Sequence, residues 1–323
     1  MGDGGSVTTA VTAGADAVAS APAPSSSGSA PSSPRPAAPT GRRLSWAWLG
    51  LFPFTVYVAL FLALPTALAI GSGFFTREGA FTWSNVAALG DPLILRTFAN
   101  SAGLSLLTAV IGAVVGALVC YALLGLSAEG TVRSAVDAAA GVLAQFGGVM
   151  LAFAFIATIG IQGVVTVFLR DAFGIDIFAN GTWLYELPGL VLPYVFFQIP
   201  LMVITFLPAL SALKLQWAEA NLTLGGSAAS FWARIGIPVL APSFIASLLL
   251  LFANAFSSYA TAAALASQGS QIVPLQIRAA LTSETVLGRE NLAGALALGM
   301  IVVVGLVMGA YTLVQRRAAR WQA

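Results

Sequence analysis

Long apolar runs dominate the chain from about residue 46 onward. A membrane-spanning helix needs about 20 mostly apolar residues, and six runs meet this length. Each run is predicted to be helical, because a backbone in lipid must satisfy its own hydrogen bonds. Strands of a membrane barrel are not expected, because the runs are too uniformly apolar. The fold class is therefore an all-α, polytopic membrane protein. The predicted spans are about 46–73, 98–125, 136–160, 187–211, 243–266 and 292–315.

The overall composition agrees with this pattern. Hydrophobic residues make up 58% of the 323 residues and charged residues only 8%. A water-soluble domain carries about 25% charged residues, so this chain has too few to cover a soluble surface. A lipid bilayer is the expected solvent for most of its length.

The first 43 residues differ from the rest. Residues 1–43 are rich in Ala, Ser, Pro and Gly and show no apolar periodicity. Such a stretch cannot offset its ordering entropy, so a disordered cytoplasmic tail is predicted, with a transmembrane domain over 44–323. It lacks the apolar core of a signal peptide. A partner-binding arm is possible in principle, but a passive extension is favoured.

The basic residues indicate an orientation in the cell inner membrane. Lys and Arg favour the cytoplasmic side, and placing both termini there satisfies this rule for six spans. Fewer basic residues and most acidic ones then lie outside. The basic residues placed inside are Arg35, Arg42, Arg43, Arg133, Lys214, Arg234, Arg316, Arg317 and Arg320.

Several kinds of chemistry are excluded or disfavoured. The chain has no His and a net charge of +2, which argues against metal sites, cofactors and nucleic-acid binding. Its single cysteine, Cys120, excludes an internal disulfide and is predicted to be a small buried hydrophobe. An intramembrane enzyme is the least favoured class, because no paired carboxylates lie within the spans.

The loop between the fourth and fifth spans is the most informative stretch. Residues 216–224 favour a short helix, Gly225-Gly226 breaks it, and Ser227 can cap a second short helix. Pro238 and Pro242 are predicted to end that second helix. The result is a helix–Gly–helix elbow, far longer than a turn needs, which suggests a cytoplasmic docking surface.

This loop resembles the "EAA" signature of permease subunits of binding-protein-dependent type I ABC importers. That pattern is Glu-Ala-Ala, three residues, Gly, nine residues, Ile, one residue, Leu, Pro. The chain has Glu219-Ala220-Asn221, then Gly225, Ile235, and Ile237-Pro238 at the same spacing. Asn221 and Ile237 depart from the pattern but keep its geometry, although Asn221 slightly weakens the first helix.

The resemblance implies a coupling helix, between the fourth and fifth transmembrane helices, that sits in a groove of a cytoplasmic ATPase. An ordinary loop with a solvated Glu219 is the alternative. The implied partners are an ABC ATPase dimer, a second permease subunit, identical or different, and an extracytoplasmic solute-binding protein, docked through 161–186 and 267–291. No Gly-x4-Gly-Lys-Ser/Thr loop is present, so ATP hydrolysis is assigned to the partner. The implied coupling residues are Glu219, Ala220, Gly225, Ile235 and Pro238.

Two further stretches support the resemblance. The second span begins with Asn100-Ser101 and continues with small and polar residues spaced by three or four, which form one helix face for close packing. Gly305 and Gly309 form a like pair in the last span. Residues 257–261 resemble the spermidine/putrescine branch, which also handles aminoethylphosphonate and other small organic ions. The stripe consists of Ser101, Ser105, Thr108, Gly112 and Gly116.

The translocation path is predicted from polar residues at depth. The spans contain almost no ionisable groups, with Asp137 at the end of the third as the nearest exception. This argues against a proton-coupled transporter, although an ion-gradient-driven secondary transporter or channel, or a non-transporting receptor, stays open. Uncharged polar residues should face the bundle interior or a cavity, as path lining or as interhelical hydrogen bonds. The path candidates are Gln145, Gln198, Asn254 and Tyr259.

Overall fold

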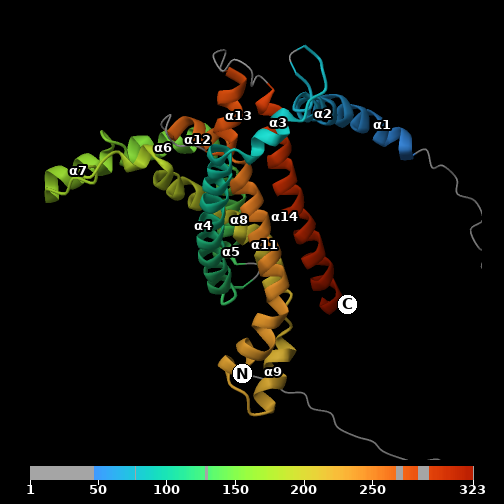
Figure 1. Cartoon of the computed structure of the whole chain (residues 1–323). Helices are drawn as coiled ribbons and strands as arrows, with labels where there is room; N and C mark the ends of the chain where they lie inside the picture. The colour runs from blue at the N-terminus through green and yellow to red at the C-terminus, as the bar shows by residue number, and fades with distance from the viewer. Residues whose placement is uncertain (1–46, 77, 128–129, 267–271, 283–290, 323) are drawn as a thin grey trace, which may run out of the picture. The chain divides into compact units, whose positions relative to one another are not determined.

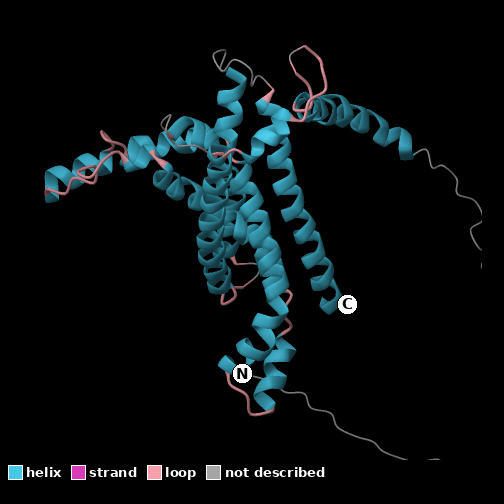
Figure 2. Ribbon diagram, in the orientation of Figure 1, coloured by secondary structure: helices cyan, strands magenta, loops and turns pink. Residues whose placement is uncertain are grey.

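A computed structural model describes residues 47–76, 78–127, 130–266, 272–282 and 291–322. The predicted tail, 1–43, lies outside the described residues. Residues from Pro53 onward form one compact unit, to which the packing below refers. Helices account for nearly all regular structure in the described residues, and the one β-bridge joins Phe75 and Phe81 (Figure 2).

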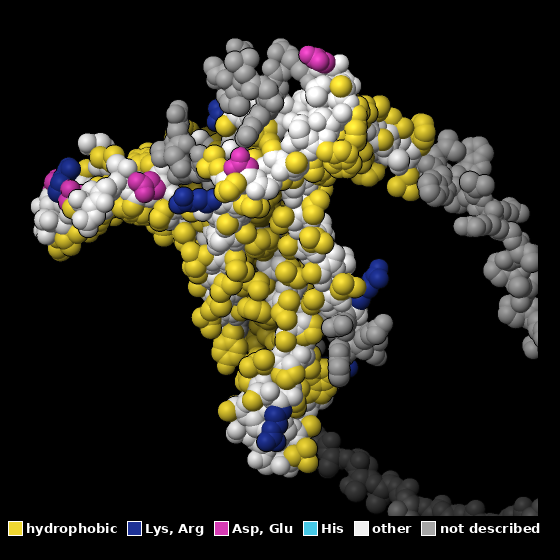
Figure 3. All heavy atoms as spheres, viewed as in Figure 1, with side chains coloured by type: hydrophobic (Ala, Val, Ile, Leu, Met, Phe, Trp, Pro, Cys, Tyr) yellow, Lys and Arg dark blue, Asp and Glu magenta, His cyan; other side chains and the backbone are white. Residues whose placement is uncertain are grey.

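Six stretches of the described residues are long and apolar enough to cross a membrane, which confirms the all-α, six-span prediction. Figure 3 shows hydrophobic side chains over most of the middle of the visible face, with the visible acidic side chains toward the end where α12 and α13 lie. The six stretches are Gly50–Ser72, Pro92–Leu123, Gly148–Phe173, Leu187–Ser211, Ala228–Ser257 and Leu292–Arg316.

The first span consists of α1 (Ala47–Val58), a π-helical turn (Ala59–Ala63) and α2 (Leu64–Ser72). None of its apolar window is buried within this chain. The end of α2 nevertheless packs closely on α14 (Leu292–Gln322), because a Cβ on Gly73 would lie 2.7 Å from the backbone nitrogen of Ala295. The short helix α3 (Ser84–Ala87) follows.

The bundle at the centre of the unit is formed by α4, α5, α8, α11 and α14 (Figure 1). Helix α4 packs against both α8 and α11, α5 packs against α8, and α14 packs against α11. Of the spanning stretches, the one that contains α8 is the most buried, and α11 lies in contact with α4, α8 and α14. The bounds are α4 Pro92–Leu123, α5 Thr131–Gln145, α8 Val191–Ser211 and α11 Ile237–Ser257.

The small and polar stripe of α4 is confirmed as a packing face. All five of its members are buried. A Cβ on Gly112 would lie 2.7 Å from that of Gln198, and one on Gly116 would lie 2.5 Å from that of Met202, so only glycine lets α4 and α8 approach this closely. Gly305 and Gly309 differ, because no described atom lies within 4 Å of a Cβ at either position.

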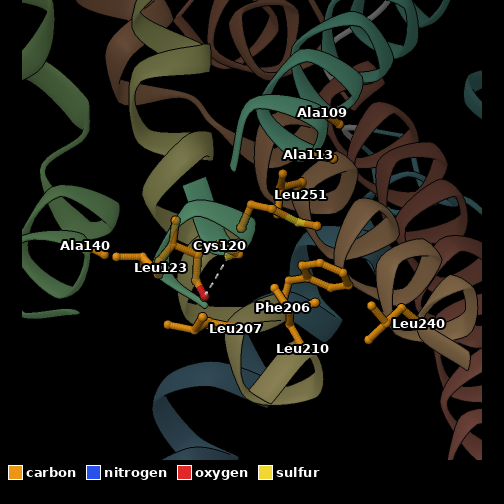
Figure 4. Packing of buried hydrophobic residues seen from close by; sticks show 12 residues of the cluster. Ala109, Ala113, Cys120, Leu123, Ala140, Phe206, Leu207, Leu210, Leu240 and Leu251 are labelled. Atoms are coloured by element: carbon orange, nitrogen blue, oxygen red, sulfur yellow. Dashed lines mark hydrogen bonds between the residues drawn. The ribbon is translucent and has the colours of Figure 1, made fainter. Parts of the chain in front are cut away.

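An apolar cluster fills the elbow half of the bundle between α4, α5, α8 and α11 (Figure 4). Cys120 is 0% exposed there, as the sequence predicts, and its thiol lies 3.9 Å from the carbonyl oxygen of Val203. Its neighbours include Leu123, Phe206 and Leu251. A second cluster packs α6 and α12 against the outer half of α8.

The predicted third span, 136–160, is not one helix. Helix α5 ends at Gln145, and α6 (Gly148–Ile159) begins after two non-helical residues. Gly147 is extended, and Gly148 has a φ of +74°, which glycine adopts without steric cost. The continuous apolar stretch therefore begins at Gly148 and runs through α7 (Val164–Phe173).

The prediction that Pro238 and Pro242 end a helix is wrong. Helix α10 (Ala228–Phe231) passes through a π-helical turn (Trp232–Gly236) into α11 with helical dihedrals throughout. A proline ring crowds the carbonyl four residues earlier, and a widened turn just before Pro238 accommodates it. The first span repeats this device, with Pro65 two residues after its π turn.

The remaining helices are short and lie between the spans, except for the 3-10 turn Leu187–Leu190, which begins the fourth apolar stretch. They are α9 (Leu215–Thr223), α12 (Ala260–Leu265), α13 (Val273–Thr282) and the 3-10 turns Ala88–Gly90, Trp183–Tyr185 and Leu187–Leu190.

Candidate functional site

The elbow between α8 and α11 has a defined backbone conformation. After α9, Gly225 adopts a left-handed φ of +78°. The N–H of Gly226 donates to the carbonyl of Asn221 (2.8 Å), and that of Gly225 donates to the carbonyl of Leu222 (2.9 Å). This is the Schellman arrangement, which satisfies carbonyls at a helix end and requires a residue that tolerates φ > 0. The predicted glycine break is therefore present, with a defined hydrogen-bond pattern.

The two arms of the elbow are tied together by side chains. The Asn221 amide nitrogen donates to the carbonyl of Ser227 at 3.0 Å. The Ser227 hydroxyl caps α10 by accepting from the N–H of Ser230 at 3.2 Å. A Cβ on Gly226 would overlap the Asn221 side chain, so this glycine provides room for the amide. The elbow is thus closed by its own contacts.

The outer surface of the elbow is apolar with one acid. Leu215, Glu219 and Leu222 follow a four-then-three spacing and share one face of α9. The two leucines are 72% and 63% exposed, and Leu224 at the tip is 88% exposed. Figure 1 shows α9 extending past the ends of α4 and α5. An exposed apolar group of this kind is typical of a protein contact surface.

The other predicted coupling residues lie along the same unit. Ala220 is exposed on α9, Ile235 is half-buried in the π turn, and Pro238 is exposed in the first turn of α11. The elbow therefore continues into a bundle helix without a break. At the end of α8, Arg133 donates to the Ser211 hydroxyl at 2.8 Å and links α5 to the start of the elbow.

Gln198, a predicted path residue, lies where α4, α8 and α11 meet. It is 0% exposed. In the amide orientation that satisfies both polar atoms, its nitrogen donates to the carbonyl of Leu251 (3.0 Å) and its oxygen accepts from the Thr108 hydroxyl (3.0 Å) and the N–H of Ala109 (3.1 Å). These contacts make it an interhelical hydrogen-bond centre within this chain.

The other three path candidates, Gln145, Asn254 and Tyr259, are exposed on this chain. Gln145 and Tyr259 flank two helix breaks that lie side by side. The N–H of Gly148 donates to the Thr261 hydroxyl at 2.9 Å, which joins the start of α6 to α12. At the other break, the Tyr194 hydroxyl donates to the carbonyl of Ser258 at 2.9 Å. We call these two breaks, 146–148 and 257–259, the broken-helix joint.

No protein-family model matches the chain. It is 26% identical, over 218 residues, to the "Trehalose transport system permease protein SugB" of Mycobacterium tuberculosis (strain CDC 1551 / Oshkosh), a match that covers 68% of this chain and 71% of the relative. A chain of a bacterial ABC transporter that imports the acidic polysaccharide alginate superposes with a TM-score of 0.65 at 16% identity, over 85% of this chain and 95% of the other. The chain has the fold of an ABC importer membrane subunit.

Two further structures agree with this importer fold. The alginate transporter in complex with a pentasaccharide-bound periplasmic protein gives a TM-score of 0.67 at 16% identity, over 84% of this chain and 94% of the other. The methionine transporter MetNI, in an inward-facing form, gives 0.51 at 14% identity, over 71% of this chain and 99% of the other.

Sequence reasoning missed two groups that hold this importer fold together. Asn221 stood out only as a departure from a pattern, yet its amide closes the elbow. Tyr194 is not singled out by the sequence, although its hydroxyl donates a hydrogen bond to the carbonyl of Ser258 at the end of α11. A buried Tyr in lipid needs a partner for its hydroxyl, and that need was the available signal.

Proposed function

We propose that this chain is the membrane-spanning permease subunit of an ATP-driven importer, and that the elbow is the surface on which a separate ATPase dimer binds. One observation carries the proposal: a self-closed elbow with exposed Leu215, Leu222 and Leu224 continues into α11 without a break. Such a unit can transmit a push from the ATPase to the bundle. Glu219, on the same exposed face, offers the charged contact.

The mechanism follows from the packing of α11. Because α10, the π turn and α11 form one continuous helix, a displacement of the elbow tilts α11 as a lever. Helix α11 packs against α4, α8 and α14, so its tilt moves the bundle. Energy thus enters at the elbow, and the spans need no buried ionisable group of the kind a proton-driven transporter uses.

A second permease subunit, identical or different, completes the path. Asn254 lies in a spanning helix yet is exposed on this chain. Tyr259, in the broken-helix joint, and Gln145, which directly precedes it, are exposed as well. Polar side chains at such depth avoid lipid and face a protein partner or a cavity. The unburied first span offers a further surface for that partner.

The charges support an inner-membrane orientation with the elbow and both termini in the cytoplasm. By the elements that carry them, Arg133, Lys214, Arg234 and Arg316 lie toward the elbow end. Toward the other end lie the basic residues Arg96, Arg170 and Arg278 together with the acids Glu78, Asp91, Asp171, Asp176 and Glu186. The outer end, with the described segment 161–186, is the proposed dock for a solute-binding protein. The first part of this segment, 161–173, also belongs to the apolar stretch Gly148–Phe173, so 174–186 is the part that lies outside every such stretch up to Glu186. Of the second predicted docking segment, 267–271 and 283–290 lie outside the described residues.

The solute is proposed to be a carbohydrate. The spermidine/putrescine branch has no support among the relatives above, one of which is a trehalose permease. A polycation would be recognised by carboxylates, yet α4, α8, α11 and α14 contain no Asp or Glu. Polyamines and aminoethylphosphonate stay in the test panel as competing solutes.

The test is reconstitution with the candidate ATPase, scored by co-purification and by ATP-dependent uptake. Gly225→Leu should abolish both while membrane insertion is unchanged, because a side chain at a φ of +78° disrupts the elbow. Glu219→Lys should act in the same direction. Gly79→Leu is the matched control, since Gly79 has a φ of +82° and open space around it but lies far from the elbow.

Two results would contradict the proposal. Normal ATPase binding and uptake in both elbow variants would show that the elbow does not couple. Uptake that follows an ion gradient and ignores ATP would instead support the secondary transporter or channel.

A further inference from the structure

A polar cleft opens between α8, α11 and α14 in the half of the bundle nearest the elbow. It has a volume of about 410 Å³. Figure 1 shows α14 diverging from α11 toward its C-terminal end. The cleft is separate from the broken-helix joint and from the elbow surface. Its polar lining comes from Thr205, Ser243, Ser247, Tyr311 and Gln315.

Ser247 is the unusual member of this lining. The residue is only 4% exposed, and it is part of the cleft lining. Among the described residues, the fully buried side-chain polar atom without a partner is the hydroxyl of Thr166 and not that of Ser247, so the Ser247 hydroxyl opens on the cleft and is not sealed in the core. Thr205, by contrast, donates to the carbonyl of Leu201 at 3.0 Å. A mostly buried residue whose hydroxyl opens on the cleft is suited to hydrogen-bond a polar ligand there.

The lining selects a chemical class. It contains hydroxyls and one amide but no Asp, Glu, Lys or Arg, so a charged ligand would find no counter-ion there. Hydroxyls and amides exchange hydrogen bonds with other hydroxyls, while Pro208 and Leu250 offer apolar contact to C–H groups. The volume lies within the range of about 300–1,000 Å³ usual for small-molecule sites.

A second cleft on the same chain provides a contrast. It has a similar volume, about 420 Å³, and lies between α4, α8 and α11 near the elbow. Its lining is almost wholly apolar, with Tyr121, Phe206 and Trp232 among its residues. That cleft suits an acyl chain, whereas the cleft around Ser247 does not.

We propose that the cleft between α8, α11 and α14 binds a neutral, hydroxyl-rich molecule of the carbohydrate class through Ser247, Ser243 and Tyr311. That this molecule is the transported solute rests on the function proposed above. Helix α11 runs from the elbow past Ser243 and Ser247, so movement of the elbow also changes the shape of the cleft. The site would then release its ligand toward the cytoplasm when the ATPase moves the elbow.

The test uses the full chain with Ala212→Cys in lipid nanodiscs, because Ala212 lines the cleft, is exposed and is not one of the proposed binding residues. The native Cys120 is 0% exposed, so a methanethiosulfonate reagent should report on the new cysteine. Trehalose, maltose and myo-inositol are the neutral probes, and glucuronate and spermidine are the charged ones. At a concentration ten times its dissociation constant, a neutral probe should slow labelling about tenfold, while the charged probes should have no effect.

A parallel measurement avoids dependence on one variant. Binding of radiolabelled trehalose, maltose and myo-inositol to the unmodified chain is compared with Ser247→Ala and Tyr311→Phe, each expected to weaken the bound probe at least fivefold. Thr312→Val is the matched control, because Thr312 lies at the same depth of α14, is exposed and already donates to the carbonyl of Gly309.

Three results would overturn the inference. In the first, no neutral probe binds or protects. In the second, a charged probe protects as well as the neutral ones. In the third, labelling is blocked in lipid and restored in detergent regardless of sugar, which would identify a lipid as the occupant. Neither assay needs the ATPase, so the two proposals can fail separately. If a sugar protects the new cysteine from labelling but no ATPase binds the chain, only the proposed function is rejected. If uptake is driven by ATP but no sugar protects the cysteine, only this site is rejected.

Discussion

At the residue scale, Gln198 shows how polarity at depth divides between structure and transport. The sequence places Gln198, Asn254, Gln145 and Tyr259 in one class, because each is a polar residue in or near an apolar run. The structure separates them: Gln198 is fully buried and hydrogen-bonded across three helices, whereas the other three are exposed. Which side of a helix meets a neighbour depends on packing that a single polar residue does not encode.

Gln198 should therefore contribute to stability through its contact with Thr108. Gln198→Leu and Thr108→Val should each destabilise the chain, and a double-mutant cycle should give a coupling of about 0.5–1.5 kcal/mol, the usual size of an interhelical hydrogen bond in a membrane protein. Reversible unfolding in mixed micelles measures this quantity. The same cycle with Thr312→Val in place of Thr108→Val should give no coupling. A zero value for the first cycle would mean that Gln198 is not tied to α4.

The stripe on α4 was predictable residue by residue, and the reason is geometric. Ser101, Ser105, Thr108, Gly112 and Gly116 repeat at helical spacing, and small groups at that spacing favour close packing in lipid. The like pair Gly305 and Gly309 has the same spacing but meets open space in this chain. The sequence indicates that a face can pack closely, but not whether the neighbour belongs to the same chain.

At the scale of elements, two Gly-Gly pairs each interrupt a helix. Gly225-Gly226 is predicted to be a break because glycine ends helices and permits φ > 0. Gly147-Gly148 also breaks a helix, but its apolar neighbours hid the signal and led to one continuous predicted span. In both pairs one glycine has a positive φ. The error at Pro238 and Pro242 is the opposite one, because the sequence predicts a helix end where the helix continues. A π turn before Pro238 lets it continue.

The elbow should respond to substitutions in a reciprocal way. Gly226→Ala should impair ATPase binding, because its Cβ overlaps the Asn221 side chain, while the backbone at Gly226 itself does not require glycine. Asn221→Ala should have a smaller effect, about 1 kcal/mol, from the loss of one hydrogen bond to Ser227. In the double variant the overlap is gone, so binding should recover to the level of Asn221→Ala alone. Co-purification with increasing amounts of the ATPase measures binding by the two single variants and the double variant. If the losses of binding in the single variants add up in the double variant, a Cβ at position 226 does not meet the Asn221 side chain.

At the scale of the whole molecule, the chain carries more surface than one subunit uses. The first span has no buried residue in its apolar window, Gly305 and Gly309 of α14 face open space, and polar side chains are exposed at depth on α11. Lipid alone can cover the apolar first span, whereas the exposed polar side chains on α11 are the surface that the second permease subunit proposed above would cover. The fold class was predictable because hydrophobicity dictates it, whereas the assembly was not, because it depends on surfaces of a second chain.

The orientation of the molecule can be tested directly, because Cys120 is 0% exposed and gives little background. Thr223→Cys places a thiol on the exposed elbow, and Ala80→Cys places one in the exposed loop after the first span. An impermeant maleimide should label Cys at position 223 only in inverted vesicles and Cys at position 80 only in right-side-out vesicles, with at least tenfold selectivity. The physical reason is the basic residues at the elbow end, which favour the cytoplasmic face.

Labelling of both positions from the outside would indicate that the membrane had leaked, and a Cys120→Ala background with a cytoplasmic marker enzyme controls for this. Labelling of position 223 from the outside in sealed vesicles has a stronger consequence. The elbow would then lie on the side of the membrane opposite the cytoplasmic ATPase. No ATPase could contact Leu215, Leu222 or Leu224, and nothing would displace α11. Orientation is therefore the property of the whole molecule on which the roles of the elbow and of the cleft beside α11 both depend.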